Sequence, residues 1–230
     1  MRYRPIALLL ALALGAITGC TSTPDPAPPS PDAAMLAGIT ADSLDDLRSA
    51  TLSLRTTGAI PGLVVQRGDA AVSTVGGDTG TAHGEATLYD VDGGIGVEFT
   101  LAEGTLTLTD KDGERTELPA EGKFAPTTLF SRDGPLGALL TRATNLRTEG
   151  VEELDGVPTY RLSGALAQSV IAEQLPGITS DVEVKFWVGG ESTPALHRVW
   201  IQVPPPRPNQ GAAMLELGLS EHNVPIPPSR

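Results

Sequence analysis

The side chains that could bind a metal or act as a general base are few and widely spaced. The three histidines are His83, His197 and His222, and the single cysteine is Cys20. No two histidines have the spacing that places metal ligands on one helical face, and the cysteine is far from all three. One cysteine also excludes an intramolecular disulfide and a cysteine-based zinc site. We therefore expect no metal and no cofactor, and we interpret the histidines as surface or turn residues.

Motifs for nucleophilic catalysis and phosphate binding are also missing from the sequence. There is no Gly-x-Ser-x-Gly segment, which disfavours a serine hydrolase. The glycine-rich segments 76–80 and 92–96 are not followed by helical patterns, so we interpret them as hairpin loops rather than phosphate-binding loops. Acidic residues cluster within 42–46 and 149–155, but their spacing does not make two carboxylates converge on a cleft, as glycoside hydrolysis requires. We interpret both clusters as solvated helix and turn faces, and we predict that the protein is not an enzyme.

Cys20 is instead placed for covalent lipidation. Arg2 and Arg4 precede an uncharged apolar stretch at 5–17, which is typical of a secretory signal. This stretch is shorter than the roughly 20 residues that span a bilayer as a helix. It ends in Ile17-Thr18-Gly19-Cys20, which resembles the bacterial lipobox, whose cysteine is diacylglyceryl-modified and becomes the first residue after cleavage. The alternative is a buried cysteine at the end of a hydrophobic run. We predict a lipoprotein signal peptide over 1–19 and lipidation of Cys20.

A proline-rich tether and a negative charge follow from the next part of the chain. Residues 21–31 contain five prolines, and in polyproline II form eleven residues reach about 34 Å.

The full chain has 16 Lys and Arg against 28 Asp and Glu, a net charge of -12. Removal of Arg2 and Arg4 with the signal gives 14 against 28, or -14. Such a chain is unsuited to sequence-independent nucleic-acid binding, and an anionic membrane would repel it. Attachment to the plasma membrane must therefore come from acyl chains on Cys20.

The rest of the sequence predicts one domain over 32–230 with an α+β fold. Helical periodicity at 32–50, 135–145 and 165–174 predicts three helices. Alternation of apolar and polar residues predicts strands within 52–55, 63–75, 86–88, 95–101, 106–108, 159–163, 182–188, 199–203 and 215–219. Because helices lie before and between two blocks of strands, we expect an antiparallel sheet curled over a few helices. Trp187 and Trp200 could flank a ligand opening, but we interpret them as core residues with satisfied N–H groups.

Four short segments occur in an order and at a spacing that together indicate a protein family more specifically than any one segment does. They are Gly58-Ala59-Ile60-Pro61-Gly62-Leu63; Phe124-Ala125-Pro126, which leads through Leu129 to Asp133-Gly134 and the predicted helix at 136–140; Glu149-Gly150 with Asp155-Gly156; and Tyr160-Arg161-Leu162-Ser163-Gly164. Together they resemble the LppX/LprA/LprF/LprG lipoprotein family of mycobacteria and related actinobacteria. The sequence departs from the family pattern at 203–210, where a proline-rich segment lengthens a loop.

The resemblance implies a fold and a function. Members of this family have a curved half-barrel sheet over helices, which encloses a large hydrophobic cavity. They bind di- and triacylated lipids and glycolipids and help to move them toward the outer envelope, in one branch alongside an efflux-type transporter. A carrier of this kind is physically reasonable, because exposing a sixteen-carbon tail to water costs about 0.8 kcal/mol per methylene, or about 12 kcal/mol per tail.

The expected cavity lining follows from strand alternation and from the two later helices. It comprises Leu52, Leu54, Ala86, Leu88, Val97, Phe99, Leu101, Leu139, Leu140, Val170, Ile171, Val184 and Phe186. In the family, Ala86 matches a position close to the cavity entrance. Each of these residues could instead pack in a closed core. The alternatives to a lipid carrier are therefore a tethered scaffold or transporter-accessory protein without a ligand, and an envelope hydrolase.

Overall fold

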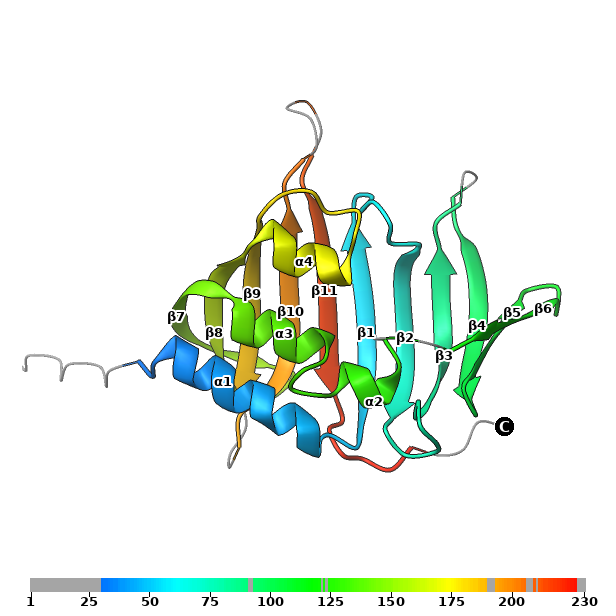
Figure 1. The fold of residues 1–230 in the computed structure, drawn as a ribbon, viewed down its shortest axis with the longest axis horizontal. Helices are drawn as coiled ribbons and strands as arrows, with labels where there is room; N and C mark the ends of the chain where they lie inside the picture. Colours follow the sequence, from blue (N-terminus) through cyan, green and yellow to red (C-terminus); the bar gives the residue numbers. More distant parts are fainter. Residues whose placement is uncertain are drawn as a thin grey trace, which may run out of the picture.

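One antiparallel sheet of eleven strands organises the chain (Figure 1). The computed structural model describes residues 30–226, apart from 91–92, 121, 123, 190–192, 206–208 and 210. The strand order is β6-β5-β4-β3-β2-β1-β11-β10-β9-β8-β7, and every pairing is antiparallel. The expected α+β class with a curved antiparallel sheet is thus confirmed. The predicted signal peptide, Cys20 and most of the tether lie outside the described residues.

The elements follow the chain in a simple order. The strands are β1 (Ser49–Thr57), β2 (Val65–Ser73), β3 (Thr81–Leu88), β4 (Ile95–Ala102), β5 (Thr105–Asp110), β6 (Arg115–Pro119), β7 (Thr144–Leu154), β8 (Val157–Leu166), β9 (Val182–Gly189), β10 (Ala195–Val203) and β11 (Ala213–Ser220). The helices are α1 (Ala33–Ser43), the single 3₁₀ turn η1 (Leu44–Asp46), α2 (Pro126–Leu129), α3 (Pro135–Arg142) and α4 (Gln168–Gln174). None of the helices in the described part of the chain is both long and apolar enough to cross a bilayer.

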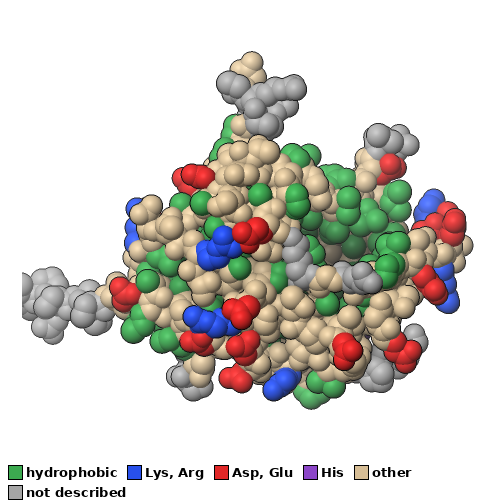
Figure 2. Space-filling model, viewed as in Figure 1, with side chains coloured by type: hydrophobic (Ala, Val, Ile, Leu, Met, Phe, Trp, Pro, Cys, Tyr) green, Lys and Arg blue, Asp and Glu red, His purple; other side chains and the backbone are tan. Residues whose placement is uncertain are grey.

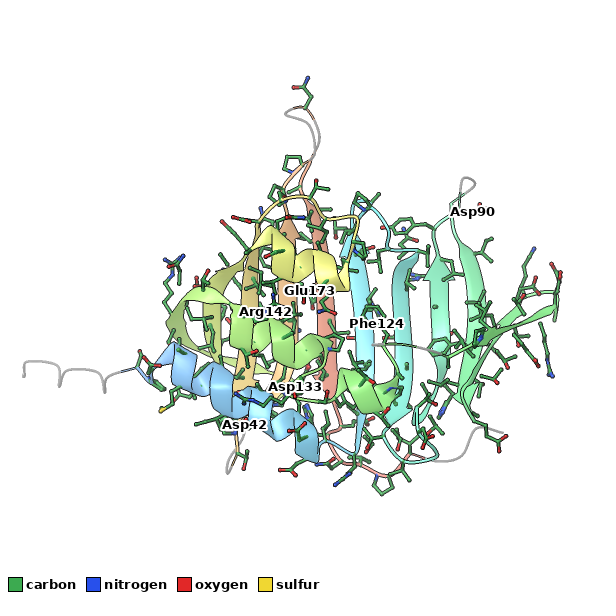
Figure 3. The ribbon with its side chains drawn as sticks, viewed as in Figure 1. Asp42, Asp90, Phe124, Asp133, Arg142 and Glu173 are labelled. Atoms are coloured by element: carbon green, nitrogen blue, oxygen red, sulfur yellow. The ribbon has the colours of Figure 1, made fainter. Side chains whose placement is uncertain are left out.

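Local sequence explains how the helical layer forms. The Asp32 carboxylate accepts a hydrogen bond from the Met35 N–H at 2.7 Å and so caps α1. The buried residues of α1 recur at helical spacing and are Ala33, Leu36, Ala37, Thr40 and Ala41. Pro135 occupies the first turn of α3, where a missing N–H costs nothing. Arg142 of α3 forms an ion pair with Glu173 of α4, which ties these two helices together (Figure 3).

The helices cover only part of one face of the sheet, which we call the inner face. Figure 1 shows α1, α3 and α4 in front of β7–β11, and the short α2 in front of β1 and β2. Under this layer the inner face is closed: Leu162, Leu166 and Phe186 are each 0% exposed. In front of β3–β6 no helix of the described chain is drawn. We call these two parts the closed half, β7–β11, and the open half, β1–β6.

Two helix boundaries differ from the sequence predictions. The first helix was expected to reach residue 50, but α1 ends at Ser43 and Ser49–Ala50 already belong to β1. The last helix was expected from Ala165, but β8 continues to Leu166 and α4 begins at Gln168. In both places a run of apolar residues fits either element, and pairing with a neighbouring strand decides the outcome.

Two strands were not predicted. They are β7 and β6, the two edges of the sheet. The exposed residues of β7 include Arg147, Glu149 and Glu153, and all five residues of β6 are exposed. Charged residues at a sheet edge prevent pairing with other chains, and they also remove the apolar alternation by which a strand is recognised. The segment around residues 149–153 is therefore a strand rather than the expected helix or turn face.

His197 and His222 are brought together at the lower end of the closed half. His197 lies at a β-bulge in β10, and its ring meets the His222 ring edge-on, with 4.8 Å between the centroids. A ring nitrogen of His222 hydrogen-bonds the Leu196 carbonyl at 2.9 Å. Burial lowers the pKa of both histidines, and the His222 ring lowers that of His197 further. No local sequence pattern predicts this pairing, because the two residues are far apart along the chain.

The helices and strands that the structure describes all lie between Ala33 and Ser220. The chain from residue 30 onward therefore contains the whole sheet and the helices that cover it, and we expect it to fold on its own.

The closed half should carry most of the stability. We expect Phe186→Ala to lower the free energy of unfolding by about 3–5 kcal/mol, because Phe186 is fully buried under the helices. Phe99→Ala, on the same inner face in the open half, should cost about 1–2 kcal/mol because Phe99 is half-buried. Urea unfolding of residues 30–230 measures both, and equal losses would contradict the division into two halves.

The histidine pair should make stability depend on pH. Both rings have lowered pKa values in the folded protein, so the unfolded chain binds more protons as the pH falls below about 6.5. The stability that the two neutral histidines contribute is therefore fully present above about pH 6.5. It is lost as the pH falls toward their lowered pKa values. We expect His222→Gln to lose less stability than the wild type between pH 7.5 and pH 5. His83→Gln, on β3 away from the pair, is the control; parallel stability curves for all three chains would refute the idea.

Candidate functional site

The candidate site is an apolar trough on the inner face of the open half. Figure 2 shows a hollow to the right of the helical layer, with hydrophobic side chains in its walls. The strand register aligns inner-face residues of neighbouring strands from β1 to β5. Leu54 pairs with Gly68, Gly68 with Ala86, Ala86 with Val97, and Phe99 with Leu108. The trough residues are Leu52, Leu54, Gly68, Ala70, Ala86, Leu88, Val97, Phe99, Leu106 and Leu108.

Small residues form the floor of the trough and larger ones form its walls. Across β2 and β3 the inner positions are Gly68, Ala70, Gly84 and Ala86. On either side lie Leu52 and Leu54 of β1 and residues 97–101 of β4. Most trough side chains are half-buried, although the short α2, in front of β1 and β2, is the only helix of the described chain on this part of the sheet. The site is thus a groove with an open front.

The predicted lining residues fall into two groups. Seven lie on the inner face of β1, β3 and β4, and they are Leu52, Leu54, Ala86, Leu88, Val97, Phe99 and Leu101. The other six lie in the closed half and are at most 6% exposed; they are Leu139, Leu140, Val170, Ile171, Val184 and Phe186. Alternation along the strands grouped the first set, but it could not reveal that the α3 and α4 residues of the second set form one buried core with Val184 and Phe186 of β9.

Three further features at the trough were not predicted. Leu106 and Leu108 of β5 extend the far wall. Phe124 is 57% exposed and projects in front of the sheet near β1 and β2 (Figure 3). At the upper end the Tyr89 hydroxyl donates a hydrogen bond to the Gly58 carbonyl at 2.7 Å and lies 2.7 Å from Thr56 Oγ1. The alternation of Leu106 and Leu108 was visible in the sequence, but no local pattern brings Tyr89 of the β3–β4 hairpin to β1.

The trough contains almost no charge. Among the described inner-face positions of β1–β5, the only ionisable side chain is Asp110, at the far upper corner. Its carboxylate accepts hydrogen bonds from the Asp112 and Glu114 N–H groups at 2.9 Å each, so it stabilises the β5–β6 turn. Such a surface can bind an alkyl chain but offers no acid, base or nucleophile for chemistry.

The acidic residues of β7 take part in a network on the outer face of the closed half. Arg161 pairs with Glu149 and Glu152 at 2.8 Å each, and Lys185 contacts Glu149 at 3.2 Å. Burial raises the pKa of Glu149, but hydrogen bonds from Ser163, Lys185 and Arg161 outweigh it and hold that pKa below its usual value. The carboxylates are therefore held in ion pairs and not directed at a cleft.

The two tryptophans belong to the same outer network and not to the core between sheet and helices. Trp187 is 8% exposed, its ring lies 5.5 Å from the Arg198 guanidinium, and its N–H donates to Glu152. Lys185 lies 5.9 Å from the Trp200 ring. Cation–π contacts and the apolar stems of these charged side chains cover the indoles where no helix does. The satisfied N–H of Trp187 was predicted correctly, but its location was not.

The outer face of the sheet also has a polar depression of about 680 Å³, which is lined by residues of β1–β5 and of the β5–β6 turn. Its side chains include Arg67, Glu85 and Glu98, and Arg55 there is already paired with Asp69 at 2.8 Å. In the part of the chain that is described, no three His, Cys, Asp or Glu side chains gather closely enough to hold a metal ion. The trough is therefore the stronger candidate for a binding site.

Comparisons with known proteins agree with this fold. The family model for the LppX_LprAFG lipoproteins matches residues 32–228. The lipoarabinomannan carrier protein LprG of Mycobacteroides abscessus is 23% identical over 229 residues, which cover 98% of this chain and 96% of the relative.

Solved structures show the same architecture. The crystal structure of LprF from Mycobacterium bovis has a TM-score of 0.70 at 22% identity, covering 86% of this chain and 96% of that chain. The crystal structure of LppX from Mycobacterium tuberculosis has a TM-score of 0.65 at 24% identity, covering 86% and 99%. Because the family model spans nearly the whole described domain, this chain belongs to the LppX_LprAFG lipoprotein family, as the sequence resemblance indicated.

Proposed function

We propose that this protein is a membrane-anchored carrier that holds the acyl chains of a lipid or glycolipid in the inner-face trough and helps to transfer it across the cell envelope. The observation that carries the proposal is the apolar inner surface of β1–β5, which the described helices cover only in part, which lies beside a well-packed core and which has Asp110 as its one described ionisable residue. The name of the relative LprG, a lipoarabinomannan carrier protein, supports a lipid ligand.

The energetics favour a carrier with this surface. Each methylene moved out of water contributes about 0.8 kcal/mol, and the half-buried Leu52, Leu54 and Phe99 would also lose their contact with water. A ligand tail and the trough therefore stabilise each other. The headgroup would stay at the open side, in contact with solvent.

Anchoring is proposed through Cys20. A diacylglyceryl group on this residue would hold the domain on the extracytoplasmic face of the plasma membrane, because the acidic domain has no attraction of its own for anionic lipids. An efflux-type transporter remains the expected protein partner from the family resemblance.

A tethered scaffold with a closed core is the second candidate. It is favoured by the six predicted lining residues that pack tightly beneath the helices. The two candidates differ in one measurement. Mass spectrometry of organic extracts from residues 30–230, exported and purified from an actinobacterial host, should show a stoichiometric acyl lipid for the carrier and none for the scaffold.

Filling the trough floor should block lipid uptake. Ala86 is half-buried between Gly68 and Val97 on the inner face, so Ala86→Trp would place an indole where an acyl chain is expected. We expect at least a tenfold loss of co-purified lipid, because an occupied floor removes most of the apolar contact area. The thermal unfolding transition should remain cooperative.

Glu85→Trp is the matched control for this substitution. Glu85 is the neighbour of Ala86 in β3, but it is exposed and faces outward. A tryptophan there adds the same ring on the opposite face and should leave lipid content unchanged. Normal lipid content in a folded Ala86→Trp variant, or equal losses in both variants, would remove the trough floor from the binding site.

Lipidation can be tested separately in the full-length chain. Cys20 is the only cysteine, so Cys20→Ala should abolish incorporation of an alkyne-tagged fatty acid in the native host. The wild-type product should also lack residues 1–19 by intact mass. Labelling that persists in Cys20→Ala would show that the acyl chain is attached elsewhere.

A further inference from the structure

A band of apolar side chains, two of them exposed and three half-buried, continues the trough at its upper end. We call this band the lip and define it as Val64, Val65, Leu88, Tyr89 and Ile95. Val65 pairs with Leu88, and Leu88 pairs with Ile95, so the three lie opposite one another across β2, β3 and β4 on the inner face. Val64 is 65% exposed and Ile95 is 45% exposed. Exposed aliphatic side chains at the mouth of an apolar groove indicate a contact surface rather than scattered surface residues.

The lip is held in place by hydrogen bonds. The Tyr89 N–H donates to the Val64 carbonyl at 2.8 Å, and the Tyr89 hydroxyl donates to the Gly58 carbonyl at 2.7 Å. These bonds connect the end of β3 to the β1–β2 loop. A tyrosine with its hydroxyl satisfied and its ring beside aliphatic residues is typical of a surface that is apolar on one side and wet on the other.

The lip is also nearly neutral in an acidic protein. Residues 56–66 contain no ionisable side chain, and neither do residues 175–178. These two segments touch, since a Cβ on Gly62 would lie 3.4 Å from the Gly177 nitrogen. The sequence of the β3–β4 loop, residues 89–94, has two carboxylates, Asp90 and Asp92, and the structure describes the first of them, at the tip of the loop (Figure 3). The full chain carries a net charge of -12, so this edge is where a lipid surface can approach with little repulsion.

We propose that the lip docks on the surface of a bilayer with uncharged, zwitterionic headgroups. The proposal rests on the carrier function above and adds where the carrier meets the membrane. A lipid tail that leaves the bilayer at the lip passes along Ile95 and Leu88 to Val97 and Ala86, and the one described ionisable side chain beside this path is Asp110, opposite Val97. Continuity between lip and trough favours a lipid surface over a protein partner, which would not need an apolar path into the groove.

The test measures vesicle binding of residues 30–230, which removes any contribution from the anchor. We expect this chain to float with phosphatidylcholine vesicles and to bind less when phosphatidylglycerol is added. Val64→Asp and Ile95→Asp should each weaken binding to phosphatidylcholine about tenfold, because an exposed aliphatic group that would contact the bilayer is replaced by a charge. The same variants should slow the transfer of a fluorescent acyl lipid between vesicles.

Two control variants match the exposure of the lip residues. Val151→Asp lies on the far edge strand β7, where Val151 is 63% exposed, and Ile39→Asp lies on α1, where Ile39 is 39% exposed. Both add the same charge at similar exposure, and each should change vesicle binding less than twofold. Cooperative thermal unfolding of all four variants shows that they fold.

Ala86→Trp separates this proposal from the carrier function. It should bind vesicles like the wild type while it takes up no lipid, because it fills the groove and leaves the lip intact. Vesicle binding without lipid uptake by the wild type would defeat the carrier function. The lip proposal is overturned if the wild type does not bind phosphatidylcholine, if lip variants bind as well as the wild type, or if the controls lose as much.

Discussion

Incomplete cover of one apolar sheet face is the constraint on which the rest of this structure depends. An antiparallel sheet whose inner face is apolar must bury that face against another layer. Here α1, α3 and α4 cover β7–β11, and only the short α2 lies in front of β1 and β2. The consequence is a change in burial along a single sheet: Phe186 is fully buried, whereas Phe99 on the same face is half-buried. A bound lipid would provide the cover that the chain itself does not.

The sequence predicts the strands of this sheet best where they are buried on one face. Strong alternation at 95–101 and 182–188 located β4 and β9 and placed their apolar residues together. Alternation did not predict β6 and β7. Both are edge strands, where charged side chains prevent aggregation and replace the apolar residues that would mark a strand. The predicted first helix was also too long, since the apolar residues around Leu47 fit a helix as well as the start of a strand. Pairing between distant segments decides such cases, and no local window contains that information.

The candidate site was predictable only in part for a related reason. Period-two alternation correctly grouped Leu52, Ala86 and Phe99 on one face of the sheet. Whether a residue on that face lines a groove or packs in a core depends on where the helices dock, and α3 and α4 dock through contacts such as the Arg142–Glu173 ion pair. Leu140 and Ile171 were therefore assigned to the lining although they pack in the core. Tyr89 was missed because its role comes from a bond to Gly58, which lies 31 positions earlier.

The shape of the trough depends on the backbone more than on the side chains that line it. At Gly84 of β3, a Cβ would collide with the Asp69 carbonyl and would lie 2.8 Å from the Ala70 Cα of β2. Only glycine allows these two strands to approach so closely, and glycines at such positions let a sheet bend. With Gly68, Ala70 and Ala86 beside it, the floor is low and the leucines of β1 and β5 form walls around it. A groove made in this way tolerates exchange among aliphatic residues, because alkyl chains need apolar area and not particular partners.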